Sequence, residues 1–230
     1  MILIIGIFFM IISWAVSSRL KSKFKKYSQI GLASGMSGRD VAERMLKDNN
    51  IYGVSVMSVE GELTDHYNPT NKTINLSPDV YHGRSAASAA IAAHECGHAV
   101  QHANAYTMLE FRSVMVPVQN VSAKIINFMF MALLFGSFIL PGVLPFNTAL
   151  IVIIACYFIF TLFAFVTLPV EFDASKRALN WIETNGIVNN QEYDMAKDAL
   201  KWAAMTYVVA ALGALVTLMY YLWLFVGGRD

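Results

Sequence analysis

Charge is scarce in this sequence. Asp, Glu, Lys and Arg make up 14% of its 230 residues, whereas about 25% is usual in soluble globular domains. Hydrophobic residues make up 56% of the chain. An ordinary soluble domain is therefore excluded, and the composition indicates a membrane protein.

Cysteine is scarce as well. The chain has two cysteines, Cys96 and Cys156, and no C-x-x-C pair. One lies in a polar segment and the other in a predicted membrane span, so we expect no disulfide between them, which fits a reducing compartment. Without a C-x-x-C pair, a zinc site built from paired thiolates is also excluded.

Positive charge is missing ahead of the first apolar run. A secretory signal peptide carries basic residues before its apolar core. Here residues 2–16 are apolar and the basic residues follow them: Arg19, Lys21, Lys23, Lys25 and Lys26. This order predicts an uncleaved membrane anchor. The basic flank is typical of a segment that lies on anionic lipid headgroups, and we favour that interpretation over nucleic-acid binding.

Four apolar segments approach the roughly 20 residues that a membrane-spanning helix needs. They are residues 2–16, 125–140, 148–168 and 207–226. Four spans place the two long polar segments, residues 17–124 and 169–206, on one side of the bilayer. These segments hold 16 of the 17 Lys and Arg, and the loop 141–147 holds none. Because Lys and Arg are retained in the cytoplasm, we expect a multi-pass cell-membrane protein with both polar segments cytoplasmic and both termini outside.

This topology divides the chain into five predicted parts. An N-terminal transmembrane anchor is followed by a cytoplasmic domain, a transmembrane helical hairpin, a second cytoplasmic segment and a C-terminal transmembrane helix. In that order, their bounds are 1–18, 19–120, 121–168, 169–206 and 207–226.

The polar segments contain both helix and strand signals. Ser37, with Asp40 three residues later, predicts a capped helix, and Asn49–Asn50 is expected to end it. Three short β runs follow, which we interpret as an antiparallel meander. They lie at 54–59, 63–67 and 72–77.

A long alanine-rich helix is predicted after these strands. Ser85 is its expected N-cap. The helix is expected to run to about Phe111, with a break near Pro117. In the second polar segment, two helices are predicted on either side of Asn185–Gly186.

Three of the five histidines lie in "AAHECGHAVQH", residues 92–102. His94 and His98 are four residues apart, so on a helix they share one face and both imidazoles can reach one Zn²⁺. Glu95 lies beside that metal without binding it, where a general base is needed, whereas Cys96 lies on the wrong face. The H-E-x-x-H pattern is typical of metal-assisted peptide hydrolysis. The alternative is a chance pair of histidines on a core helix.

The third metal ligand has to come from outside this pair. The metzincin pattern requires glycine and histidine where the chain has Gln101 and Asn104, so that class is excluded. His102 lies one further turn along the helix and is displaced around its axis from His94. We therefore expect it in the wall of the cleft or behind the ligands.

A catalytic zinc usually has three protein ligands and one water, which leaves the glutamates to consider. Glu110 lies too far along the same predicted helix, and Glu183 and Glu192 look solvent-exposed beside the break between the later helices. Glu171 follows Pro169 at the cytoplasmic end of the third span, on the same side of the membrane as the histidines. It is favoured, although a charge that merely ends a span gives the same pattern.

Beside the spans, three segments carry a resemblance: "LTDHYNPTNKTINLSPDVYHGRS", "IAAHECGHAVQH" and "LPVEFDASKRAL". With them the chain resembles the YugP-like neutral zinc metallopeptidases, a family of bacterial membrane proteins. More distantly it is similar to HtpX-type and CAAX-prenyl-type proteases of the gluzincin class, whose third ligand is the Glu of an E-x-x-x-D motif. The resemblance implies that this ligand is Glu171. The Asp of that motif, which supports a zinc-binding histidine, is replaced here by Ser175, and Asp173 lies on the opposite side of the helix.

One further role comes with this resemblance. In the same class, an exposed edge strand ahead of the metal helix holds the substrate in extended form. The expected segment here is 72–77, centred on Ile74, Asn75 and Leu76. From the residues alone, the group that stabilises the oxyanion is left open among His102, Arg177 and Tyr193, with Tyr81–His82 as a weaker candidate.

The expected fold is an α+β membrane protein: about four transmembrane helices and a cytoplasmic zincin-like domain with a small antiparallel sheet and an H-E-x-x-H helix. Its expected function is that of an integral membrane zinc metalloendopeptidase at the cytoplasmic face. One Zn²⁺ per chain is held by His94, His98 and Glu171, and Glu95 is the catalytic base. The expected partners are a polypeptide substrate, which we expect to be a membrane protein, and the lipid bilayer, with no nucleic acid; homo-oligomers are left open.

Two other functions are weighed against this one. An intramembrane site-2-type protease also uses H-E-x-x-H, but polar residues surround this site helix and no later span contains Asp. A non-catalytic membrane scaffold with a structural zinc needs a fourth protein ligand, for which His102 is the nearby candidate.

Overall fold

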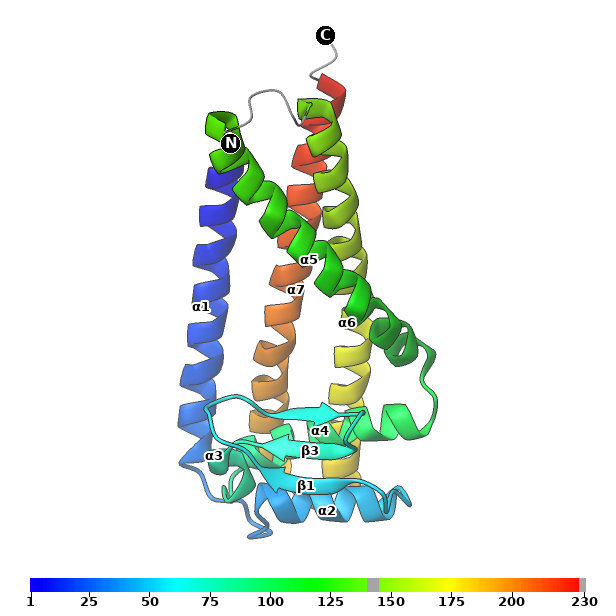
Figure 1. Cartoon of the computed structure of the whole chain (residues 1–230). Coiled ribbons are helices and arrows are strands. Elements are labelled where there is room, and N and C mark those ends of the chain that lie inside the picture. Colours follow the sequence, from blue (N-terminus) through cyan, green and yellow to red (C-terminus); the bar gives the residue numbers. More distant parts are fainter. Residues whose placement is uncertain (140–144, 228–230) are drawn as a thin grey trace. The chain divides into compact units, whose positions relative to one another are not determined.

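The computed structural model describes residues 1–139 and 145–227 (Figure 1). The end of the predicted span 125–140 and most of the loop 141–147 lie outside these residues. Along the chain the elements are α1 (Ile2–Ser28), α2 (Gly38–Asp48), β1 (Ser55–Ser58), β2 (His66–Asn68), β3 (Thr73–Leu76), α3 (Pro78–Tyr81), α4 (Ala86–Ala103), α5 (Thr107–Ile139), α6 (Phe146–Thr184) and α7 (Asn190–Gly227).

Four of the described helices are long and apolar enough to cross a membrane, which agrees with the predicted number. By length and composition the candidate spans are Ile2–Ser28, Thr107–Ala132, Phe146–Thr184 and Asn190–Gly227. The second begins well before the predicted residue 125. Pro117 lies inside α5, at the cost of one backbone hydrogen bond that proline cannot donate, so the predicted break there is wrong.

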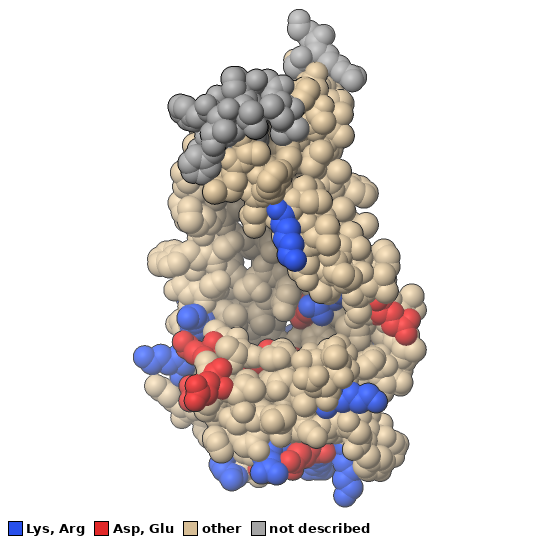
Figure 2. Space-filling model, in the orientation of Figure 1, with Lys and Arg blue, Asp and Glu red and all other residues tan. Residues whose placement is uncertain are grey.

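Residue contacts divide the chain into two units. Unit 1 consists of 1–13, 111–168 and 207–230, and unit 2 consists of 14–110 and 169–206. Among the described side chains of unit 1, only Arg112 and Lys124 are charged, and the visible surface over its helices is almost entirely uncharged (Figure 2). Such a composition suits helices that face lipid, because charged side chains are costly there.

Helix α2 of unit 2 begins where the sequence predicts. The Asp40 N–H donates to the Ser37 hydroxyl over 3.2 Å, and the Asp40 carboxylate accepts from the Ser37 N–H over 2.8 Å. These two bonds form a capping box. The helix ends at Asp48, and Asn50 adopts a left-handed φ of 58°, which confirms the predicted stop.

The sheet differs from the predicted antiparallel meander. Its strand order is β1–β3–β2; β2 is antiparallel to β3, whereas β1 is parallel to it. The Asn68 side chain accepts hydrogen bonds from the N–H groups of Thr70 and Asn71, which closes a tight turn between β2 and β3. Strand β1 then pairs with the remaining edge of β3, and the alternation of polar and apolar residues does not encode that choice of partner.

This strand order also corrects the predicted substrate-binding edge. Strand β3 lies between two partners; Ile74 and Leu76 are fully buried and Asn75 is nearly so. Its backbone is therefore not available to an extended ligand. The edge strand that contacts α4 is β2.

Helix α4 is shorter than predicted. The Ser85 hydroxyl accepts from the Ser88 N–H, as expected of an N-cap, but the helix ends at Ala103. Ala105 adopts a left-handed φ of 48° and α5 begins at Thr107, so the predicted end near Phe111 is wrong and Glu110 belongs to the next helix. The predicted break at Asn185–Gly186 is confirmed between α6 and α7.

Small residues let α4 pack closely against α6. A Cβ atom added at Gly97 would lie 2.6 Å from the carbonyl oxygen of Ala174, a distance that no real Cβ tolerates. Ala174 itself is fully buried. This close approach brings the histidine face of α4 opposite Glu171 on α6.

Candidate metal centre

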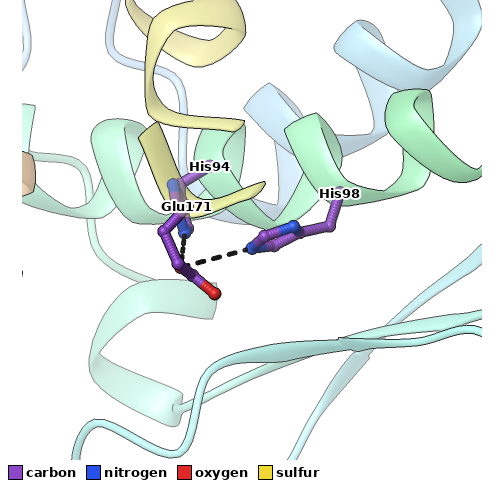
Figure 3. A group of neighbouring side chains, drawn as sticks. All are labelled: His94, His98 and Glu171. Atoms are coloured by element: carbon purple, nitrogen blue, oxygen red, sulfur yellow. Dashed lines mark ion pairs between the residues drawn. The ribbon is translucent and has the colours of Figure 1, made fainter. Parts of the chain in front are cut away.

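Three side chains from two helices converge on one point (Figure 3). The Nε2 atoms of His94 and His98 lie 3.4 and 3.7 Å from Oε2 of Glu171. One ligand atom from each of the three residues lies within 4.8 Å of the others. His98 and Glu171 are buried, with 8% and 3% of their surface exposed. The arrangement can hold a metal ion, and two imidazoles with one carboxylate form a donor set that suits zinc.

Protons and a metal compete for this site. Burial alone would lower the pKa of His98, but the contact with Glu171 and the negative charge of Glu95 and Glu171 raise it above its ordinary value. A metal-binding histidine has to be neutral. Metal binding at His98 is therefore expected to weaken as the pH falls.

The outer nitrogen of His98 is held by Gln101. The Gln101 side chain is fully buried, and its Nε2 donates to the Val170 carbonyl and to Asp173 Oδ2, each over 2.8 Å. Its Oε1 lies 3.0 Å from His98 Nδ1. Because the amide nitrogen is committed to two acceptors, Oε1 accepts, and His98 carries its proton on Nδ1. The lone pair of His98 Nε2 is then free to bind a metal at the point where the three side chains converge.

His94 has a comparable partner. The Ser175 hydroxyl lies 3.1 Å from His94 Nδ1, so this candidate does reach a histidine of the centre. Asp173 does not replace it; its carboxylate binds Gln101 and accepts from Arg177 Nε over 2.6 Å. The sequence interpretation missed Gln101, although its spacing of three residues from His98 places the two on neighbouring positions of a helix.

Glu95 is tied to the sheet. Its Oε2 accepts a hydrogen bond from the Tyr67 backbone N–H over 2.9 Å, and only 7% of its surface is exposed. Tyr67 lies on β2, the edge strand that contacts α4. The same tyrosine reaches His102, whose Nδ1 lies 2.7 Å from the phenol oxygen.

The remaining candidates lie elsewhere. Arg177 forms an ion pair with Asp173, and its Cζ atom lies 6.0 Å from the centre of the Tyr106 ring. Tyr193 lines a groove between α6 and α7. Glu192 was expected to be exposed, but it is buried; it accepts from the N–H groups of Ala33 and Asn189 and so caps α7.

Known proteins match this chain over nearly its whole length. Residues 2–226 match the family described as "Putative neutral zinc metallopeptidase". The chain is 40% identical over 218 residues to the "Putative membrane protease YugP" of Bacillus subtilis, an alignment that covers 94% of this chain and 92% of that protein. No solved structure matches it. The resemblance inferred from the sequence is confirmed, and the chain belongs to this family of neutral zinc metallopeptidases.

Proposed function

We propose that this protein is an integral membrane zinc metalloendopeptidase with its site on the cytoplasmic face. The observation that carries the proposal is the convergence of His94, His98 and Glu171 on one point, with a buried Glu95 that follows His94 in the chain. A zinc ion bound there would act as a Lewis acid, which lowers the pKa of a water molecule and polarises a peptide carbonyl. The cytoplasmic placement rests on the distribution of Lys and Arg along the sequence.

Glu95 is the proposed base. The hydrogen bond from Tyr67 holds Oε2, so we assign proton transfer to Oε1. This oxygen takes a proton from the attacking water and later gives it to the leaving amine. Only 7% of the Glu95 surface is exposed, so little solvent competes for that proton.

His102 and Tyr67 are the proposed oxyanion stabilisers. Their hydrogen bond links the last turn of α4 to β2, and the Tyr67 backbone also holds Glu95. This pair is favoured over Arg177, because Asp173 already engages that guanidinium. Substrates are proposed to be membrane or membrane-adjacent polypeptides, because α6 carries Glu171 and is itself a candidate span.

The scaffold alternative receives less support. A closed structural zinc site needs four protein ligands, whereas the group found among the described residues has three. His102, the candidate for a fourth ligand, bonds to Tyr67 instead.

Replacing Glu95 with Gln tests the proposal. The variant keeps the size of the side chain and the hydrogen bond to Tyr67 but removes the base. We expect normal zinc content and a loss of about 10²–10⁴-fold in cleavage of an unfolded casein-like substrate. Glu60→Gln makes the same chemical change at an exposed position and should cleave like the wild type. Equal cleavage by the Glu95 variant, with zinc bound, contradicts the assignment.

A further inference from the structure

A groove of about 640 Å³ lies between α6 and α7 in unit 2. Its lining comes from residues 172–183 of α6 and 193–205 of α7. The two helices are joined by a short connection at 185–189, so they run antiparallel, and residues equally far from the connection lie at the same level. The volume falls within the range of about 300–1,000 Å³ that small-molecule sites occupy.

The polarity of this α6–α7 groove changes along its length. The end farthest from the connection carries Ala204 and Met205, and Phe172 lies at about the level of the outermost lysine. The other two lysines follow at the middle levels, with leucines among them, and the end nearest the connection carries Glu183 and Tyr193. Apolar residues therefore extend past the lysines at one end of the groove, and hydrogen-bonding groups lie at the other.

Three lysines line the middle of the groove. Lys176, Lys197 and Lys201 are exposed, and among the ion pairs of the described residues none includes them. Glu183 is the one acidic residue in the described lining. An occupant with a negative charge at this level is complementary to the groove.

The groove is separate from the proposed catalytic cleft. Ser175 forms part of its lining and contacts His94 at Nδ1, whereas Glu171 faces the same imidazole at Nε2. The two nitrogens lie on different sides of the ring. An occupant of the groove would therefore lie behind the metal ligand and leave the metal side open.

We propose that the α6–α7 groove binds one anionic phospholipid, with its phosphate at Lys176, Lys197 and Lys201. The apolar end of the groove is the end that leads, along each helix, into an apolar stretch: α6 is apolar up to Leu168, and α7 is apolar from Tyr207. A lipid places its acyl chains toward that end and its headgroup among the lysines. Basic pockets between spanning helices at headgroup level bind anionic headgroups in this manner. A free phosphate or an acidic peptide leaves the apolar end unfilled.

Lipid binding to the full-length protein, stripped of lipid in a nonionic detergent, tests this proposal. Native mass spectrometry would compare phosphatidylglycerol with phosphatidylcholine of the same acyl chains. We expect one phosphatidylglycerol per chain, preferred about tenfold or more, and a loss of that preference in K176Q/K197Q/K201Q. R39Q/R44Q/K47Q removes three exposed charges from α2, away from the basic flank of α1, and should retain the preference. Zinc content, measured in each variant, verifies the fold without reference to peptidase activity.

Several results would overturn the proposal. Equal binding of the two lipids by the wild type shows that the lysines do not select charge. An unchanged preference in the groove variant, or an equal loss in the α2 variant, shows that the anion binds elsewhere. Competition experiments with glycerol phosphate and with an acidic peptide test whether the occupant is a lipid. If either one displaces bound phosphatidylglycerol at the concentration at which the lipid itself does so, the groove is assigned to that ligand instead. None of these results depends on peptide hydrolysis, so the proposed function is judged separately.

Discussion

Replacing Gln101 with Met should weaken zinc binding although Gln101 is not a ligand. Methionine has a similar length and volume, so the change removes hydrogen bonds with little loss of packing. The His98 Nδ1–H loses its acceptor, and Val170 and Asp173 each lose a donor. With its outer nitrogen released, the His98 ring is free to rotate or to change tautomer.

The size of the effect follows from these contacts. Loss of a group that supports a metal-binding histidine typically costs 10–100-fold in metal affinity, which is about 1.4–2.8 kcal/mol. The buried His98 donor left unpaired costs a further 1–3 kcal/mol or so of folding stability. Asp173 keeps its bond to Arg177, and so the Asp173 carboxylate should add little to that cost.

A chelator competition measures zinc affinity, and thermal unfolding with and without zinc measures stability. Gln191→Met makes the same change at an exposed position of α7 and should alter neither. If Gln101→Met binds zinc as tightly as the wild type, the link from Gln101 to His98 does not orient the ligand. A lower unfolding temperature of the metal-free protein, with zinc affinity unchanged, would leave Gln101 a purely structural role.

Further variants address the other parts of the site and the fold. Glu171→Gln should lower zinc affinity at least about tenfold, since an amide is a poor zinc ligand, whereas exposed Glu183→Gln should not; chelator competition measures both. Ser175→Asp should raise zinc affinity in the same assay, because a carboxylate is a stronger acceptor than a hydroxyl for a histidine N–H; lower affinity would contradict this. Hydrogen bonds from the Ser37 hydroxyl and backbone hold the pKa of Asp40 below its ordinary value of 3.8. The charged cap therefore stabilises the fold fully above that pH and loses this effect as the pH falls through the lower pKa of the folded state. Asp40→Asn should melt lower than the wild type at pH 7, and the gap should shrink as the pH falls below 3.8; a gap that stays constant would refute this.

The sequence predicted the elements of this fold more reliably than their connections. Helix starts at Ser37 and Ser85 are local events, decided by one side chain and the backbone three residues on, so they can be inferred from a short window. The partner of β1 is a tertiary choice. The turn at Asn68 pairs β2 with one edge of β3 and leaves the other edge to β1. The sequence of β1 itself does not indicate which strand it will pair with. The substrate-edge prediction failed because it depended on that choice.

The site shows the same division between local and tertiary information. His94 and His98 are paired by the helix repeat alone, so their spacing was enough to predict that they share a face. Glu171 lies 73 residues beyond His98 in the chain. The close contact of Gly97 with Ala174 brings it next to the histidines, and this contact cannot be predicted from sequence spacing. Gln101 lies between these cases. Its position relative to His98 is local, but its role depends on Val170 and Asp173, because two acceptors on α6 fix which end of the amide faces the histidine. A glutamine on a helix can therefore orient a candidate metal ligand only where a second helix fixes its amide.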